Sequence, residues 1–280
     1  MTYGEDAMLF ELDKTKCVRC GACVRDCSFG ALKTDAAGYP FIKDEKRCMR
    51  CQHCFAVCPK GAITFDGCRA ADSIATAGLT LPSAEAVENW LQVRRSVRRF
   101  QEADVDPATL DRILRLLGNV PTGCNARALT FICHPTRQST DAFRQRFIHA
   151  VEEHRDGTKL LPRWLAVPAI KLRQGKADIF FRGAPGLLII TSDETDKAVT
   201  TPREDLAAAC TYFEMLANAH GLATCWCGFL QMVQKVVPEL LEKTSGIRRT
   251  TPFCAMLFGR PALTYPRGVQ RSAYAKVVYA

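Results

Sequence analysis

CVRCGACVRDC, residues 17–27, places four cysteines within eleven positions of the chain. CMRCQHCFAVCP, residues 48–59, repeats that cysteine spacing 31 residues later. The match extends beyond the cysteines, because Asp13 corresponds to Asp44 and the sequence Gly-Ala-Leu at 30–32 corresponds to Gly-Ala-Ile at 61–63. A repeat this short predicts two copies of one loop–helix unit related by a pseudo-twofold axis.

Eight cysteines in two matching runs favour a metal cofactor over disulfides. The 280-residue chain starts with the acidic stretch MTYGEDAMLFELDK, which lacks the layout of a signal peptide, and no stretch is long and apolar enough to predict a membrane span. We therefore expect a cytoplasmic protein with no membrane partner, in which thiols stay reduced. Thiolate sulfur suits a polynuclear iron–sulfur cluster better than a single zinc ion. Two alternatives stay open, a pair of zinc ribbons and a cluster with a structural role alone.

The spacing C-x₂-C-x₂-C-x₃-C-P is typical of bacterial iron–sulfur proteins. Residues 48–59 fit it completely, whereas Ser28 stands where the first run would have its proline. Residues 8–66 therefore resemble the bacterial two-cluster ferredoxins. The resemblance implies two [4Fe–4S] clusters, in which the fourth cysteine of each run binds the cluster of the other run. The implied ligands are Cys17, Cys20, Cys23 and Cys58 for the first cluster, and Cys48, Cys51, Cys54 and Cys27 for the second.

The rest of the chain has the helix and strand signals of an α+β or α/β sandwich. Three helices with N-terminal capping residues are predicted, from 84 to 95 after Ser83, from 107 to about 118 after Asp106, and from 202 to about 220 after Thr201. Thr201 and Glu204 are expected to form a capping box for the third helix. This helix is apolar around most of its circumference, so we expect burial on nearly all sides. Strands are predicted at 129–133, 186–191, 223–228 and 252–259.

RRSVRRF, residues 94–100, follows directly after the first predicted helix of this part. Its arginines and serine suit a phosphate group, because guanidinium forks match phosphate oxygens and a hydroxyl adds a neutral contact. An exposed basic helix end that complements the helix dipole fits the composition equally well. Composition alone does not choose between these interpretations.

The order of motifs favours the first interpretation. RRSVRRF resembles the opening motif of the nitroreductase-like FMN flavoproteins, and further motifs similar to those of that family follow in the family's order. These are VPTGCNA (120–126), RGAP (182–185), the alanine-rich helix from Asp205, GLATCWCG (221–228) and FGRP (258–261). The chain as a whole thus resembles a nitroreductase-family protein with an N-terminal two-cluster ferredoxin domain. The resemblance implies a small ferredoxin-like domain (1–66), a connector (67–83) and an FMN-binding α+β sandwich (84–280) that forms a homodimer.

The same resemblance implies the residues that contact FMN. They are Arg94, Arg95, Ser96 and Arg98 of the arginine motif, Pro121, Thr122, Gly123 and Asn125 of a loop that reaches FMN from the other subunit, Cys227 and Gly228 by their backbone, and Arg271 after the last strand. Arg94 is expected at the phosphate and Arg98 near the N1/O2 edge of the ring, while Arg267 competes with Arg271 for the phosphate. We expect no catalytic side chain, because the flavin itself would be the reactive group. Residues 155–180 are expected to form either a lid or a surface excursion.

The implied function is electron transfer from a low-potential donor, a ferredoxin-like protein or NAD(P)H, through both clusters to FMN. The flavin would then reduce an electron-poor small molecule such as a nitroaromatic, a quinone or an activated alkene. One alternative is a relay to a partner protein without small-molecule turnover, and another is a redox sensor with a degenerate flavin site. The net charge of +9 is not accompanied by an aromatic-interleaved basic stripe, so we expect no nucleic-acid partner.

Overall fold

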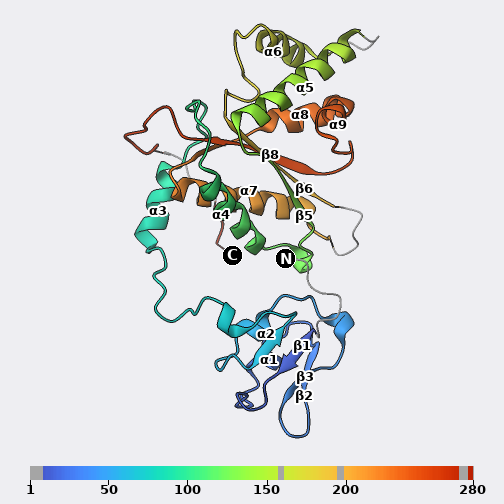
Figure 1. Ribbon diagram of the computed structural model, residues 1–280, viewed down its shortest axis with the longest axis vertical. Coiled ribbons are helices and arrows are strands. Elements are labelled where there is room, and N and C mark those ends of the chain that lie inside the picture. The colour runs from blue at the N-terminus through green and yellow to red at the C-terminus, as the bar shows by residue number, and fades with distance from the viewer. Residues whose placement is uncertain (1–8, 157–160, 194–198, 271–276, 280) are drawn as a thin grey trace. The chain divides into compact units, whose positions relative to one another are not determined.

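Figure 1 shows the computed structural model of the protein, which describes residues 9–156, 161–193, 199–270 and 277–279. The chain divides into two compact units, Met1–Leu81 and Pro82–Ala280. Among the described residues we find no helix with the length and apolar character that crossing a membrane requires.

The first unit consists of two small antiparallel sheets and two short helices. The elements are β1 (Phe10–Leu12), α1 (Ala22–Arg25), β2 (Leu32–Thr34), β3 (Pro40–Ile42), α2 (His53–Ala56) and β4 (Ile63–Phe65). Strand β1 pairs with β4, and β2 pairs with β3. The buried side chains at its centre include Leu32, Ile63 and Phe65.

The backbone of this unit repeats at the same interval as the sequence. Helix α2 begins 31 residues after α1, at His53 and Ala22. The loops before these helices share left-handed backbone positions, because Arg19 and Arg50 have φ values of 56° and 50°. Asp13 and Asp44 start the two copies in the same way, each accepting a backbone N–H bond at 3.0 Å from the residue two positions later. The predicted loop–helix repeat is therefore present in the backbone.

The segment expected as a connector, 67–83, is only partly irregular. Cys68 forms a β-bridge with Phe65, and a 3₁₀ turn follows at Ala70–Asp72. Residues 73–83 form no helix or strand and are exposed to solvent.

The second unit is built around a four-stranded antiparallel sheet with the strand order β5-β6-β8-β7. The strands are β5 (Leu129–His134), β6 (Gly186–Ser192), β7 (Ala223–Trp226) and β8 (Phe253–Gly259). The helices are α3 (Ala84–Val93), α4 (Pro107–Leu116), α5 (Arg137–Asp156), α6 (Arg163–Arg173), α7 (Pro202–Ala219), α8 (Gly228–Val236) and α9 (Pro238–Ser245). The predicted α+β fold is confirmed, with each predicted strand close to its expected limits.

Helices cover both faces of this sheet. In Figure 1, α5, α6, α8 and α9 lie on one side of the sheet and α4 and α7 on the other. Alternate residues of β6 belong to the two cores, because Leu187 and Ile189 pack on the α5 side whereas Leu188 and Ile190 pack on the α7 side. Strand β6 is buried along its whole length for this reason.

Two of the three predicted helix caps are confirmed. The Ser83 hydroxyl accepts the N–H of Ala86 at 3.1 Å, and the Asp106 carboxylate accepts the N–H of Thr109 at 2.8 Å. The capping box at Thr201 is wrong, because its side chain caps no amide of α7. The Thr201 hydroxyl instead donates to the carboxylate of Asp205 at 2.9 Å.

The expectation that α7 is buried on nearly all sides is also wrong for the single chain. Its inner side, which includes Leu206, Cys210 and Phe213, is buried against the sheet. Its outer side exposes Tyr212 and Met215, at 40% and 47% of their full surface. The apolar circumference of α7 therefore leaves an uncovered apolar stripe.

Candidate functional sites

One pocket of the first unit is lined by cysteines from both repeats. Cys17, Cys20 and Cys23 come from the first run, and Cys58 comes from the second. The backbone N–H of Ala62 points at the Cys58 sulfur at 3.3 Å. The structure therefore brings together the four cysteines expected at the first cluster. We call this space the first cysteine pocket.

The cysteines expected at the second cluster also lie near one another. Burial raises the pKa of Cys48, and negative charge on Cys51 and Cys27 raises it further. Burial also raises the pKa of the Cys54 thiol to about 12, with added contributions from Cys48 and Cys51. Negative charge on Cys27, the last cysteine of the first run, thus acts on Cys48 of the second run.

The donor chemistry of both sets fits an iron–sulfur cluster. Among the described residues, no three His, Cys, Asp or Glu side chains are close enough together to share one metal ion. Thiols spread around a pocket suit a cluster, because a cluster distributes its ligands over several iron atoms. The amide that points at Cys58 would also stabilise negative charge on that sulfur.

In the second unit, the arginine motif runs along the end of the sheet. Ser96 forms a parallel bridge with Thr224 of β7, and the N–H of Val97 donates to the Thr224 carbonyl at 2.9 Å. At the other end of the motif, Phe100 forms a bridge with Pro261, just beyond β8. These backbone contacts fix the segment that carries the arginines.

The arginines of the motif bind acceptors of the protein itself, and Arg98 and Arg99 donate to the carbonyls of Ser96 and Arg98. Arg94 forms an ion pair with Glu214 of α7 at 3.3 Å, and Thr224 donates a hydrogen bond to the same carboxylate at 2.9 Å. Arg95 donates to the carbonyls of Arg94 and Gln92. Sequence reasoning missed Glu214, although an acidic residue between Phe213 and Met215 of an apolar helix was a signal that it has a buried partner.

Three residues expected to contact FMN line one pocket. Arg98, Cys227 and Gly228 surround a space of about 220 Å³, which we call the Arg98 pocket. Arg182 and aromatic side chains, among them Phe180, also line it. The RGAP motif contains Arg182, but sequence reasoning gave this residue no role.

The Arg98 pocket has room for a group beside Gly228. A Cβ atom added to Gly228 would meet no other atom within 4 Å, so the backbone there faces open space. The adjacent thiol of Cys227 is buried, and burial raises its pKa to about 12. The pocket therefore presents the backbone of residues 227–228, and not a reactive thiolate, to a ligand.

The loop 121–125 is held by the start of α7. The N–H of Gly123 donates to Asp205 at 2.9 Å, and a Cβ atom on Gly123 would lie 2.0 Å from the Thr201 hydroxyl, so only glycine fits. Thr122 lines a separate pocket of about 200 Å³ together with Arg127. No pocket described for the single chain joins this loop to Arg98.

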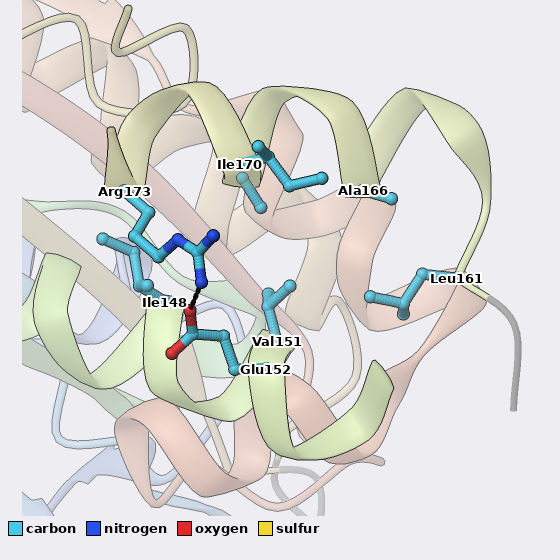
Figure 2. A pocket seen from close by; sticks show the side chains of 8 residues that line it. Ile148, Val151, Glu152, Leu161, Ala166, Ile170 and Arg173 are labelled. Carbon is cyan, nitrogen blue, oxygen red and sulfur yellow. Dashed lines mark hydrogen bonds and ion pairs between the residues drawn. The ribbon is translucent and has the colours of Figure 1, made fainter. Parts of the chain in front are cut away.

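The remaining expectations concern the chain end and the segment 155–180. Arg271 lies outside the described residues, whereas Arg267 is exposed. Helix α6 packs on α5 around a small apolar pocket, beside which Arg173 and Glu152 form an ion pair at 2.6 Å (Figure 2). Of the described residues in 155–180, only Ile179 and Phe180 line the Arg98 pocket.

Comparisons with known proteins agree with this architecture. Residues 91–260 match the model of the nitroreductase family, and residues 16–63 match the model of a 4Fe-4S dicluster domain. A comparison with curated protein sequences gave no significant match.

Several solved structures share the fold of the second unit. A nitroreductase with bound FMN from Bacteroides fragilis NCTC 9343 is 19% identical, with a TM-score of 0.52 over 69% of this chain and 98% of that chain. One from Desulfitobacterium hafniense DCB-2, also with bound FMN, is 19% identical, with a TM-score of 0.50 over 69% and 97%. An FMN-dependent nitroreductase from Clostridium difficile R20291 is 17% identical, with a TM-score of 0.50 over 71% and 100%.

Proposed function

The chain belongs to the nitroreductase family, and from this premise we propose that it is an FMN-dependent oxidoreductase with two [4Fe–4S] clusters. It takes electrons from a low-potential donor, a ferredoxin-like protein or NAD(P)H, and delivers them to an electron-poor small molecule. A nitroaromatic, a quinone or an activated alkene is the expected acceptor. The observation that carries the proposal is that the same chain has the first cysteine pocket, which is lined by cysteines of both repeats, and the Arg98 pocket.

FMN would occupy the Arg98 pocket. When bound, it exchanges electrons singly or in pairs, and so links one-electron carriers to two-electron chemistry. The guanidinium of Arg98 would favour negative charge on the ring, and the backbone at Cys227 and Gly228 would lie against it. The other proposed contacts are Arg94, Arg95, Ser96, Pro121, Thr122, Gly123, Asn125 and Arg271.

The first unit would hold the clusters. Cys17, Cys20, Cys23 and Cys58 would bind one, and Cys48, Cys51, Cys54 and Cys27 would bind the other. This assignment is supported by the first cysteine pocket and by the electrostatic influence of Cys27 on Cys48. We assign the clusters to a domain at 1–66 and FMN to a domain at 84–280.

The proposed function is tested by anaerobic purification with iron, sulfide and flavin quantified. We expect about eight irons and about one FMN per chain. Stepwise reduction with NADH, NADPH and reduced ferredoxin, with cluster and flavin absorption followed separately, then identifies the donor. Four irons or none would contradict the cluster assignment. Rapid reduction of FMN without turnover of any small molecule would instead favour a relay.

The path through the clusters is tested by Cys51→Ser. Loss of the second cluster should abolish turnover with reduced ferredoxin, because electrons would have no route to the flavin. The matched control is Cys68→Ser, which changes a cysteine of the same unit that lies outside both runs and should retain turnover. Turnover by the Cys51→Ser variant, once its second cluster is shown to be absent, would disprove the path.

The same proposal includes a homodimer. The stripe of Tyr212 and Met215 on α7, together with exposed Val87 and Leu91 on α3, gives an apolar surface for a second copy. The loop 121–125 would then reach the FMN of the partner. Sedimentation of the FMN-loaded protein should give twice the chain mass of 31.0 kDa.

A further inference from the structure

Arg182 brings a second guanidinium group to the Arg98 pocket. The Arg182 side chain is half-buried. Burial raises the pKa of Cys225, and the positive charges of Arg98 and Arg182 both oppose that rise. No acidic residue lines this pocket in the described part of the chain. Arg98 donates to the Ser96 carbonyl at 3.2 Å, whereas Arg182 has no hydrogen bond or ion pair to another described residue.

The backbone at Arg182 is strained in a way that needs support. Its φ of 56° is in the left-handed region, which is unfavourable for a residue with a long side chain. Asp178 holds this conformation from both sides. Its carboxylate accepts the N–H of Phe181 at 2.7 Å and the N–H of Gly183 at 2.9 Å. The two amides that flank Arg182 are thus bound to one side chain.

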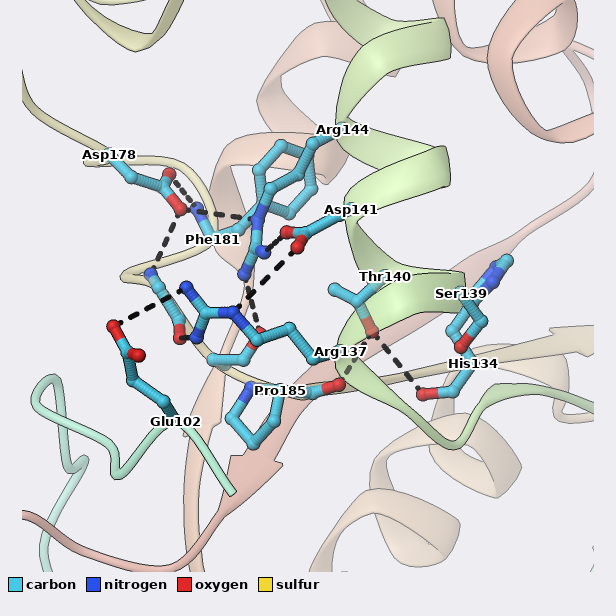
Figure 3. Close-up of polar contacts among 12 residues, drawn as sticks. Glu102, His134, Arg137, Ser139, Thr140, Asp141, Arg144, Asp178, Phe181 and Pro185 are labelled. Carbon is cyan, nitrogen blue, oxygen red and sulfur yellow. Dashed lines mark hydrogen bonds and ion pairs between the residues drawn. The ribbon is translucent and has the colours of Figure 1, made fainter. Parts of the chain in front are cut away.

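Asp178 is in turn fixed by Arg144 of α5, as Figure 3 shows. The two side chains form an ion pair at 3.3 Å, and only 7% of the Arg144 side chain is exposed. Arg144 also pairs with Asp141 and donates to the carbonyl of Ala184. The loop that carries Arg182 is therefore tied to a buried cation on a long helix.

This arrangement presents an unpaired cation in a pocket with aromatic walls. Strained backbone persists where the surroundings determine it, and it is concentrated at ligand sites. The charge of Arg182 has no protein partner among the described residues, so an anionic ligand would pair with it. Phe180, Trp226 and Phe229 line the same pocket and offer faces or edges to a flat ring.

We infer that Arg182 binds a negatively charged group of the electron acceptor, so that the pocket selects electron-poor aromatic compounds that carry a carboxylate or another anionic group. This inference rests on the proposed function, because the proposed function places FMN in the Arg98 pocket. FMN has candidate partners for its own negative charge in the arginine motif and in Arg271, whereas Arg182 belongs to the RGAP motif, to which the family resemblance gave no FMN contact. The second ligand is then the one that needs Arg182.

The test compares 4-nitrobenzoate with 4-nitrobenzamide, which has nearly the same shape but no charge. Binding of each compound to the FMN-loaded protein is measured by calorimetry, and turnover is measured as kcat/KM with the donor found active. The wild type should prefer the anion by about tenfold, the range expected for a charge-assisted hydrogen bond. Arg182→Gln should remove the preference, and Arg182→Lys should restore most of it.

Controls separate a role in acceptor binding from other roles. Arg115→Gln changes an exposed arginine of α4 and should keep the preference. FMN affinity should be the same in the wild type and in Arg182→Gln. The inference would be overturned if Arg182→Gln lost affinity equally for both compounds or bound FMN more weakly. It would also be overturned if the wild type showed no preference for the anion. Failure of the proposed function would differ, because the FMN-loaded protein would then reduce neither compound, while calorimetry would still report the charge preference.

Discussion

Gly228 shows how a single residue can leave space for a cofactor. It is the first residue of α8 and lines the Arg98 pocket, and an added Cβ would meet no protein atom within 4 Å. Its φ is not in the left-handed region, so the backbone itself does not demand glycine. The fold therefore does not explain the absence of a side chain at this position, whereas the proposed contact with FMN would.

We expect Gly228→Val to weaken FMN binding by about tenfold or more, because methyl groups forced into a filled contact cost about 1–3 kcal/mol. The melting temperature of the flavin-free protein should stay close to that of the wild type. Flavin fluorescence titration measures the first quantity and calorimetry the second. Ala108→Val, at an exposed position of α4, is the control and should bind FMN normally. A large drop in the melting temperature would show that Gly228 serves the fold.

At the scale of elements, helix α5 determines the shape of a loop distant from it in sequence. Arg144 and Arg137 both extend from α5 toward the loop before β6, but their surroundings differ (Figure 3). Arg144 is buried, whereas the Arg137 side chain is 36% exposed and its ion pairs with Glu102 and Asp141 are 3.8 and 3.7 Å long. The two arginines therefore offer a matched comparison of buried and partly exposed cations.

Arg144→Ala should lower the free energy of unfolding by about 3 kcal/mol, because the Asp178 carboxylate loses its buried partner. That figure is the low end of the range for buried pairs, since 17% of the Asp178 side chain is exposed. Arg137→Ala should cost less than about 1 kcal/mol, as is usual for exposed pairs. Urea unfolding of both variants measures the difference. Equal losses would contradict the role given to Arg144.

At the scale of the whole molecule, the two units have unequal cores. The second unit buries two extensive layers of side chains on either side of its sheet. The first unit has a small core, which includes Leu32, Ile63 and Phe65 and in which Cys23 and Cys54 are themselves buried members. A small core of this kind usually needs a metal centre for stability.

Removal of iron with a chelator should therefore unfold the first unit and leave the second folded. Hydrogen exchange followed by mass spectrometry measures this in the full chain. Peptides from 9–66 should lose protection, while peptides from β6 and β8 should keep it, because those strands are buried on both faces. Retained protection in 9–66 after complete iron loss would show that the first unit folds on its own side chains.

The sequence predicted local features well and distant contacts poorly. The strands β5–β8 and the caps at Ser83 and Asp106 depend on short patterns, and they were predicted close to their observed limits. Helices α5, α6, α8 and α9 were not predicted, and in α6 the helix continues through Pro168. The pair Arg94–Glu214 spans 120 residues and depends on how α7 packs, so no local pattern could identify Arg94 as the partner of Glu214.

The residues expected to contact FMN come from distant parts of the chain, and the single chain brings only some of them together. Arg98, Cys227 and Gly228 meet because the strand β7 places them together, whereas Thr122 lines a different pocket of the single chain. The role of Arg182 depends on Asp178 and Arg144, and that chain of contacts appears only in three dimensions.

Cys58 of the second repeat lines the first cysteine pocket together with cysteines of the first repeat, and this has a consequence for how the chain arose. A single copy of the 31-residue segment could not complete the first cysteine pocket, because Cys58 belongs to the other copy. A one-copy ancestor would have needed a second molecule to close either site. Fusion of the two copies would have made that pairing intramolecular, so that iron capture no longer depended on protein concentration.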